Sequence, residues 1–319
     1  MFALILALTL ALAFANGAND VSKGIATLVG SGIANYRAII LWGTIWTVAG
    51  AMTAAFGAQT LVATFSGKGL LQAPDASPKF LFAIAAGATA WLLIATRSGL
   101  PVSTTHALIG ALCGAAIASG HVVKWPAVLT KVALPLALSP FLSIIIVLAI
   151  RPLFHLAPSN VTRKNAPVSA EAGFTTTDAL HWLFAGASSF FRGMNDAPKI
   201  VALSAAVTGI YPLVAIAIAA GSIIYGFRVT ETLARKVTQI EPRDGFLANL
   251  VTSFLVAAAS GYALPVSTTH VSTGAIIGIG AAHGGGELRW KTIRDVLLAW
   301  LVTLPVAAIL GGAIFIALR

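Results

Sequence analysis

The heptapeptide LPVSTTH occupies residues 100–106 and recurs letter for letter at residues 264–270. Each copy inserts three hydroxyl side chains and a histidine into an apolar stretch of a chain in which 58% of residues are hydrophobic and 9% are charged. Soluble domains carry roughly 25% charged residues. The composition therefore indicates a polytopic helical membrane protein, and the duplicated motif indicates that its two halves are related.

Ten apolar segments are arranged as two groups of five around one polar stretch. They cover residues 2–32, 39–65, 80–95, 102–119 and 128–150, and then 179–210, 213–227, 246–264, 266–282 and 293–318. Residues 151–177, between the groups, are rich in proline, hydroxyl residues and charges. We therefore predict a first transmembrane repeat over residues 1–150, a cytoplasmic linker over 151–177, and a second repeat over 178–319.

A second motif pair supports this division. GANDVSK at residues 17–23 matches GMNDAPK at 193–199 in the corresponding segment of the other half, and glycines follow both LPVSTTH copies at the same spacing. Small residues at such spacing allow close helix packing. If each half crosses an odd number of times, the second copy is inverted. The sequence thus predicts an all-α membrane protein of two inverted repeats, with interrupted or re-entrant helices meeting at the midplane.

The formal net charge of +10 predicts an orientation. With the N-terminus outside, the loops predicted inside hold Arg37, Arg97, Arg151, Arg163, Lys164, Arg228, Arg235, Lys236, Arg243, Arg289, Lys291 and Arg294, and those predicted outside hold Lys68, Lys79, Lys124 and Arg319. This excess follows the positive-inside rule, so we expect both termini outside a plasma (inner) membrane. The basic residues form no basic helix or aromatic platform, so we expect contact with lipid and not with nucleic acid.

LPVSTTH has the chemistry of an oxyanion site. Pro101 and Pro265 suit the first turn of a helix, and the residues after them would present hydroxyls and unpaired N–H groups at the positive end of the helix dipole. The predicted substrate-binding residues of this motif are Ser103, Thr104, Thr105, Ser267, Thr268 and Thr269. The alternative is that these hydroxyls only cap their helices. Duplication favours the anion site, which both halves would share.

The histidines that end the motifs, His106 and His270, would either relay protons or form buried structural hydrogen bonds. A Ser–His enzyme is the competing hypothesis. It fits poorly because a nucleophile needs one oriented base and one oxyanion hole, and symmetric duplication of the whole set has no purpose. We therefore expect a protein that is not an enzyme and has no cofactor.

Two aspartates, Asp20 and Asp196, lie deep in apolar segments, where a carboxylate is costly and usually functional. Lys23 and Lys199 follow three residues later on the same helical face. Either the pairs are functional, or each lysine only neutralises its aspartate. Arg192 adds a cation without a counterpart, so the site favours anions. Gly17, Gly193 and Pro198 also predict interrupted helices here.

The duplicated GAND-like and PVSTTH motifs resemble the inorganic phosphate transporter family over nearly the whole chain. The resemblance implies a phosphate permease coupled to protons or sodium, with some relatives that carry sulfate. It also implies that Asn19, Asp20, Asn195 and Asp196 belong to the substrate and coupling-ion site, including any sodium near the aspartates. The chain departs from the family pattern where both copies have lysine in place of asparagine, because lysine cannot ligate sodium.

These observations predict a secondary active symporter that imports phosphate by alternating access, with protons favoured as the coupling ion. A sulfate permease of the same family is the alternative, and a passive anion channel is the alternative from another class. The glycine-rich faces would pack either within the chain or between chains of a homo-oligomer.

Overall fold

The computed structural model describes residues 1–73, 75–155, 174–205, 207–262 and 264–319. Its principal helices are α1 (Phe2–Asp20), α2 (Ser22–Ser31), α3 (Tyr36–Thr53), α4 (Gln59–Phe65), α5 (Pro78–Arg97), α6 (Thr104–Ser119), α7 (Trp125–Val128), α8 (Leu134–His155), α9 (Thr176–Val201), α10 (Ile210–Tyr225), α11 (Phe227–Arg235), α12 (Pro242–Gly261), α13 (Thr268–Ala282) and α14 (Trp290–Ala317). All ten predicted segments are mainly helical, and the described residues contain no β-strand.

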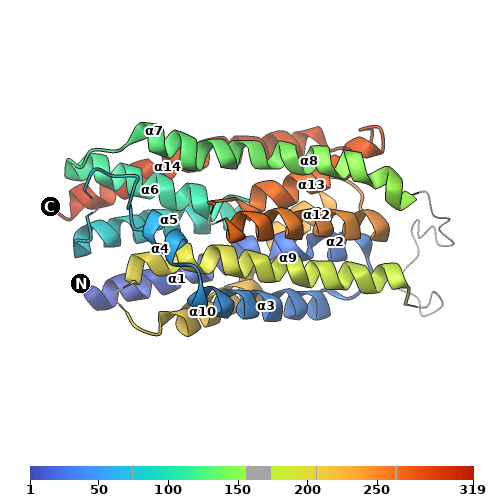
Figure 1. The fold of residues 1–319 in the computed structure, drawn as a ribbon, viewed down its shortest axis with the longest axis horizontal. Helices are drawn as coiled ribbons and strands as arrows, with labels where there is room; N and C mark the ends of the chain where they lie inside the picture. The colour runs from blue at the N-terminus through green and yellow to red at the C-terminus, as the bar shows by residue number, and fades with distance from the viewer. Residues whose placement is uncertain (74, 156–173, 206, 263) are drawn as a thin grey trace.

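Six helical stretches are long and apolar enough to cross a membrane, and the pair α10 and α11, bent by 65°, would make a seventh. The helix α9 is not among them because it carries buried charges in its second half. Long apolar helices in this number make the chain a multi-pass membrane protein. They form one elongated bundle (Figure 1).

The two helices that flank each LPVSTTH copy form a hairpin. In the first, Phe80 near the start of α5 lies beside His121, just after α6, with 5.9 Å between ring centroids. In the second, Nε2 of His283, just after α13, lies 3.2 Å from Oδ2 of Asp244 near the start of α12. Because the ends of each hairpin lie together, its tip carries LPVSTTH into the middle of the bundle (Figure 1). The hairpins have the form that the predicted re-entrant elements would take.

The hairpins also change the expected loop assignments. Arg97 ends α5 at the first hairpin tip, where its carbonyl accepts a hydrogen bond from Arg228 at 2.8 Å. It therefore lies at this tip and not, as predicted, in a loop at the end of the molecule. Two other residues of that charge count, Arg163 and Lys164, lie outside the described residues.

Each hairpin packs on a helix from the other half of the chain. A Cβ atom at Gly114 of α6 would lie 1.9 Å from the carbonyl oxygen of Ala308 in α14. A Cβ atom at Gly274 of α13 would lie 2.5 Å from the carbonyl oxygen of Pro140 in α8. Only glycine permits approaches this close. The glycine spacing therefore predicted close packing correctly, and the structure adds that the partners are exchanged.

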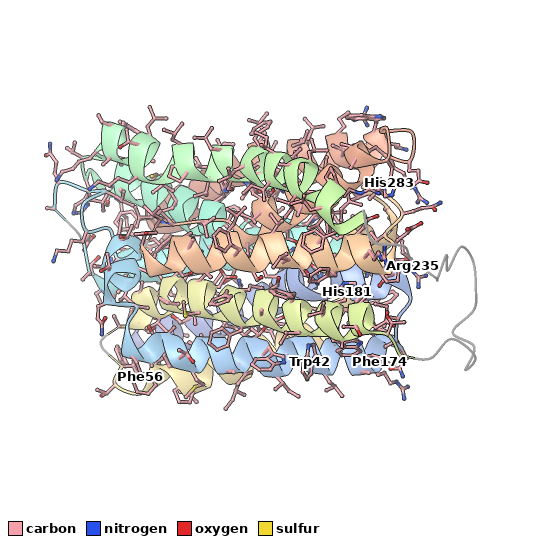
Figure 2. The ribbon with its side chains drawn as sticks, turned by 45° about the vertical axis from the view of Figure 1, so that its right-hand side comes forward. Trp42, Phe56, Phe174, His181, Arg235 and His283 are labelled. Atoms are coloured by element: carbon pink, nitrogen blue, oxygen red, sulfur yellow. The ribbon has the colours of Figure 1, made fainter. Side chains whose placement is uncertain are left out.

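The two halves run in opposite directions. Figure 1 shows α6 running from the centre towards the left end and α13 towards the right end, with both termini at the left. Figure 2 shows Phe56 near that same end, and Arg235 and His283 at the opposite one. An inverted repeat would have this arrangement. The repeat itself, and which end faces outwards, remain predictions.

The predicted interruptions of the motif helices are mostly wrong. Only Val21 separates α1 from α2, and its backbone is helical (φ −56°, ψ −33°), while α9 continues through Gly193 and Pro198 to Val201. The hairpin tips supply the helix ends instead. The predicted linker of residues 151–177 is helical at both of its edges, since α8 reaches His155 and α9 begins at Thr176. Residues 156–173 lie outside the described residues.

Candidate functional site

Serine, and not proline, begins each motif helix. The hydroxyl oxygen of Ser103 accepts a hydrogen bond from the backbone N–H of His106, and Ser267 does the same for His270, both at 3.2 Å. The helices consequently start three residues after the prolines, so the predicted place of the prolines in the first turn is wrong. The capping alternative thus holds for both serines, whose hydroxyl hydrogens can still donate to a ligand.

The N-termini of α6 and α13 meet at the centre. Thr105 Oγ1 donates to the carbonyl of Val266 at 3.3 Å, and Thr269 Oγ1 donates to the carbonyl of Val102 at 2.9 Å. The six serine and threonine residues of the two motifs are all buried. The first N–H groups of a helix have no intrahelical partner. Two positive helix ends therefore converge on one buried point.

Lys23 is held by three oxygens from its own helix region. Its Nζ lies 2.7 Å from the backbone carbonyl of Asn19, 2.7 Å from the side-chain oxygen of Asn19 and 2.7 Å from Oδ1 of Asp20. The predicted pair of Asp20 and Lys23 is thus formed. An ammonium group with three donors is fully paired by such a set.

In the second half of the chain, Lys199 is also held by three oxygens, and two of them come from the hairpin tips. Its Nζ lies 2.8 Å from Thr105 Oγ1, 3.0 Å from the Val266 carbonyl and 3.2 Å from Asp196 Oδ1. This second predicted pair is longer than the first. Lys199 therefore links the aspartate of α9 to both LPVSTTH tips.

The two motif asparagines anchor the hairpin tips. Asn19 Nδ2 lies 3.0 Å from the Leu100 carbonyl, and its Oδ1 accepts from the Val102 N–H at 3.2 Å. Asn195 Nδ2 donates to the Val266 carbonyl at 3.2 Å, while its Oδ1 is buried without a hydrogen-bond partner. Both residues lie in the predicted site. In this arrangement their amide groups bind the protein itself.

Asn16 connects both halves of the site, and the sequence reasoning did not assign it a role. Its Nδ2 lies within 2.9 Å of Asp20 Oδ2 and of Thr104 Oγ1, and 3.2 Å from Asp196 Oδ2. Its Oδ1 accepts from Arg192 at 3.4 Å. The available signal was its place four residues before Asp20, on the same helical face.

Arg192 completes the charge cluster. Its Nη2 donates to Thr47 Oγ1 at 2.7 Å, whereas its Nε has no partner. The five charged side chains at the centre are Asp20, Lys23, Arg192, Asp196 and Lys199, and none is more than 2% exposed. Three positive and two negative groups leave a formal charge of +1. The buried centre thus carries the net positive charge on which the predicted anion preference rests.

The histidines of the motifs lie together, with 4.8 Å between the ring centroids of His106 and His270. His270 also stacks on Trp300 at 3.9 Å and pairs through Nδ1 with the Leu136 carbonyl at 2.9 Å. Nδ1 of His106 and Nε2 of His270 have no partner. Ser103 Oγ pairs with the backbone N–H of His106, so this hydrogen bond does not join the hydroxyl to the imidazole ring.

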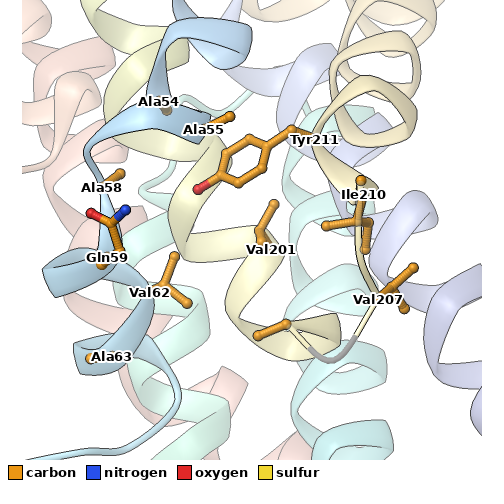
Figure 3. Close-up of a pocket in the computed structure, with 12 residues that line it drawn as sticks. Ala54, Ala55, Ala58, Gln59, Val62, Ala63, Val201, Val207, Ile210 and Tyr211 are labelled. Atoms are coloured by element: carbon orange, nitrogen blue, oxygen red, sulfur yellow. The ribbon is translucent and has the colours of Figure 1, made fainter.

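A cavity of about 330 Å³ opens between α4 and the α9–α10 connection (Figure 3). Its lining includes Gln59, Val62, Val201 and Tyr211. Val201 follows Lys199 by two residues, and the ring of Phe65 at the end of α4 lies 5.8 Å from Lys199 Nζ. The cavity thus approaches the charge cluster from the end of the bundle that holds the termini.

The phosphate transporter family model matches residues 16–311. The chain belongs to this family. Two relatives are each a probable low-affinity inorganic phosphate transporter. The Mycobacterium leprae protein is 30% identical, with 99% of this chain and 78% of that protein covered. The Rhizobium meliloti protein is 29% identical, with 98% and 95% covered. A solved sodium-dependent phosphate transporter shares the fold, with a TM-score of 0.86, 24% identity and coverage of 99% and 98%. The family is one of transporters, not enzymes.

Proposed function

We propose that this protein is a secondary carrier that imports inorganic phosphate across the plasma membrane, with the anion held between the two LPVSTTH tips. The observation that carries the proposal is the meeting of two helix N-termini at a buried point of net positive charge. Helix N-termini bind phosphate through backbone N–H groups. The hydroxyls of Ser103, Thr104 and Thr105, and of their counterparts Ser267, Thr268 and Thr269, would complete the site.

Selection of phosphate over sulfate would depend on Asp196. Phosphate at neutral pH still carries a hydrogen that it can donate, and a carboxylate accepts it. Oδ1 and Oδ2 of Asp20 are engaged at 2.7 to 2.9 Å. The contacts of the Asp196 carboxylate with Asn16, Asn195 and Lys199 are longer, at 3.2 Å. Asp196 is therefore the more available acceptor for a bound phosphate.

The coupling ion would be the proton. Lys23 and Lys199 each fill a set of three oxygen acceptors of the type that a sodium ion would need. A tethered ammonium repels a second cation at such a site. We infer that the lysines replace sodium near Asp20 and Asp196, and that proton transfer within these pairs accompanies transport.

Uptake of labelled phosphate into proteoliposomes tests both parts, with sodium and pH gradients imposed separately. We expect accumulation against the phosphate gradient when the pH gradient is present and little response to sodium. Strict sodium dependence without a response to pH would overturn the choice of coupling ion. Equilibration without accumulation under every gradient would identify a passive anion channel.

Competition with unlabelled anions tests the substrate. We expect excess unlabelled phosphate to abolish uptake of labelled phosphate. The same concentration of unlabelled sulfate should have little effect. Equal competition by sulfate would favour the sulfate permease. The pairing of both aspartates with lysines would then explain why phosphate is not preferred.

The oligomeric state is a separate question. Light scattering of the same preparation would show whether the protein is a monomer or a homo-oligomer.

A further inference from the structure

A second buried polar cluster lies away from the central site, where α9, α2 and α12 pack together. His181 on α9 is fully buried, and its Nε2 lies 2.9 Å from Thr27 Oγ1 on α2. The same hydroxyl oxygen accepts a hydrogen bond from Asn249 Nδ2 on α12 at 2.6 Å. Within the described residues, Nδ1 of His181 has no hydrogen-bond partner. A buried polar atom without a partner costs free energy, so this ring nitrogen needs an explanation.

The cluster connects the centre to one end of the bundle. Thr27 lies one helical turn beyond Lys23 on α2, a separation of about 6 Å along the helix axis. Because the Lys23 ammonium points back to Asn19 and Asp20, a path from this pair to Thr27 needs water molecules in between. In the other direction His181 is one turn from Thr177, where the start of α9 is partly exposed. Figure 2 shows His181 inside the bundle, towards the end that carries Arg235 and His283.

The backbone is shaped around the imidazole. A Cβ atom at Gly245 of α12 would lie 2.3 Å from Cε1 of His181, so only glycine leaves room for the ring. The ring contacts Thr27 of α2 and Gly245 of α12, and Asn249 of α12 bonds to the Thr27 hydroxyl. None of these three residues is charged. The charged residues nearest to it along these three helices are Lys23, Asp178 and Asp244.

We propose that His181 and Thr27 form the path along which the coupling proton passes between the central Asp20–Lys23 pair and the end of the bundle where α9 begins. Imidazole can accept a proton at one ring nitrogen and release another proton from the other nitrogen, so no proton is gained or lost in the relay. Thr27 supplies a hydroxyl that can accept on one side and donate on the other. This inference depends on the proposed proton coupling.

Substitution of His181 by glutamine tests the path, with His121→Gln as the control for the same change near the opposite end. Two quantities are measured in proteoliposomes: phosphate uptake driven by a pH gradient, with internal pH recorded by a trapped dye, and exchange of labelled for unlabelled phosphate at equal pH. We expect His181→Gln to lower driven uptake and proton flux at least tenfold while exchange stays within twofold of the wild type.

Loss of exchange and driven uptake together would indicate a purely structural histidine and overturn the proposal. Unchanged proton flux in His181→Gln would overturn it as well. The wild-type protein is the separate check on coupling, because phosphate uptake without any pH change would refute proton coupling before a variant is made.

Two further variants approach the path without altering the imidazole. Gly245→Ala should displace the ring and lower driven uptake several-fold, whereas Gly261→Ala on the same helix, where a Cβ would meet nothing within 4 Å, should not. Thr27→Val removes the hydroxyl at nearly constant volume and should act like His181→Gln, with the partly exposed Thr64→Val as control. Wild-type proton flux in both Gly245→Ala and Thr27→Val would contradict the proposed path.

Discussion

At the scale of single residues, the two aspartates are related in sequence but bonded differently. Asp20 is tightly bound by Lys23, Asn16 and Thr104, whereas the Asp196 contacts are longer. The cause is the position of the lysines, because Lys199 also bonds to the hairpin tips and Lys23 bonds within its own helix. Equivalent motif positions thus have different hydrogen-bond partners.

Asp196→Asn should therefore change selectivity. It replaces an acceptor-only carboxylate with an amide, and hydrogen bonds to charged groups contribute about 1.5–3 kcal/mol. We expect the preference for phosphate over sulfate to fall at least tenfold in competition assays. Asp20→Asn is the matched variant, and it should depress transport of both anions. An unchanged preference in Asp196→Asn would exclude this carboxylate as the selecting group.

Lys23→Asn should create a response to sodium. The change removes the ammonium from three oxygens and supplies an amide oxygen, a ligand suited to hard cations. We expect phosphate uptake by this variant to rise several-fold when sodium replaces potassium. The control is Lys124→Asn, an exposed position outside the site. Uptake by Lys23→Asn that ignores sodium would show that the lysine does not occupy a cation site.

At the scale of helices, the glycines of α6 and α13 determine how deeply each hairpin is seated. Gly114→Ala would place a methyl group 1.9 Å from the Ala308 carbonyl, which forces α6 away from α14. Overpacking of this kind typically costs about 1–3 kcal/mol. We expect Gly114→Ala to have a lower melting temperature in detergent than the control Gly57→Ala, where a Cβ meets nothing within 4 Å. Equal melting temperatures would show that α14 adjusts freely.

The sequence predicted helices well and their ends poorly. All ten apolar segments are helical, since long apolar runs in lipid leave few alternatives. The start of α6 was misplaced because proline favours a first turn, but the chain stays extended until Ser103 supplies a cap. Asn16 was missed as a site residue because its partners Thr104 and Asp196 are 88 and 180 residues away, a proximity that only the fold creates.

At the scale of the whole molecule, the predicted orientation can be tested by labelling. With the buried Cys113 replaced by alanine, Lys68→Cys and Glu287→Cys place single thiols at exposed positions near opposite ends. A membrane-impermeant maleimide added to intact cells should label Lys68→Cys and reach Glu287→Cys only after permeabilisation. The reverse pattern would invert the proposed orientation, and labelling of both from outside would contradict the opposed hairpins.

The exchanged packing of the hairpins has a consequence for biosynthesis. The face of α6 that carries Gly110 and Gly114 is covered by α14, which leaves the ribosome almost two hundred residues later. During synthesis the first hairpin therefore forms before α14 can pack against it, as is common for contacts distant in sequence. A chain that stops before α14 would hold every residue of the central charge cluster and yet leave the first hairpin without the helix that packs on α6.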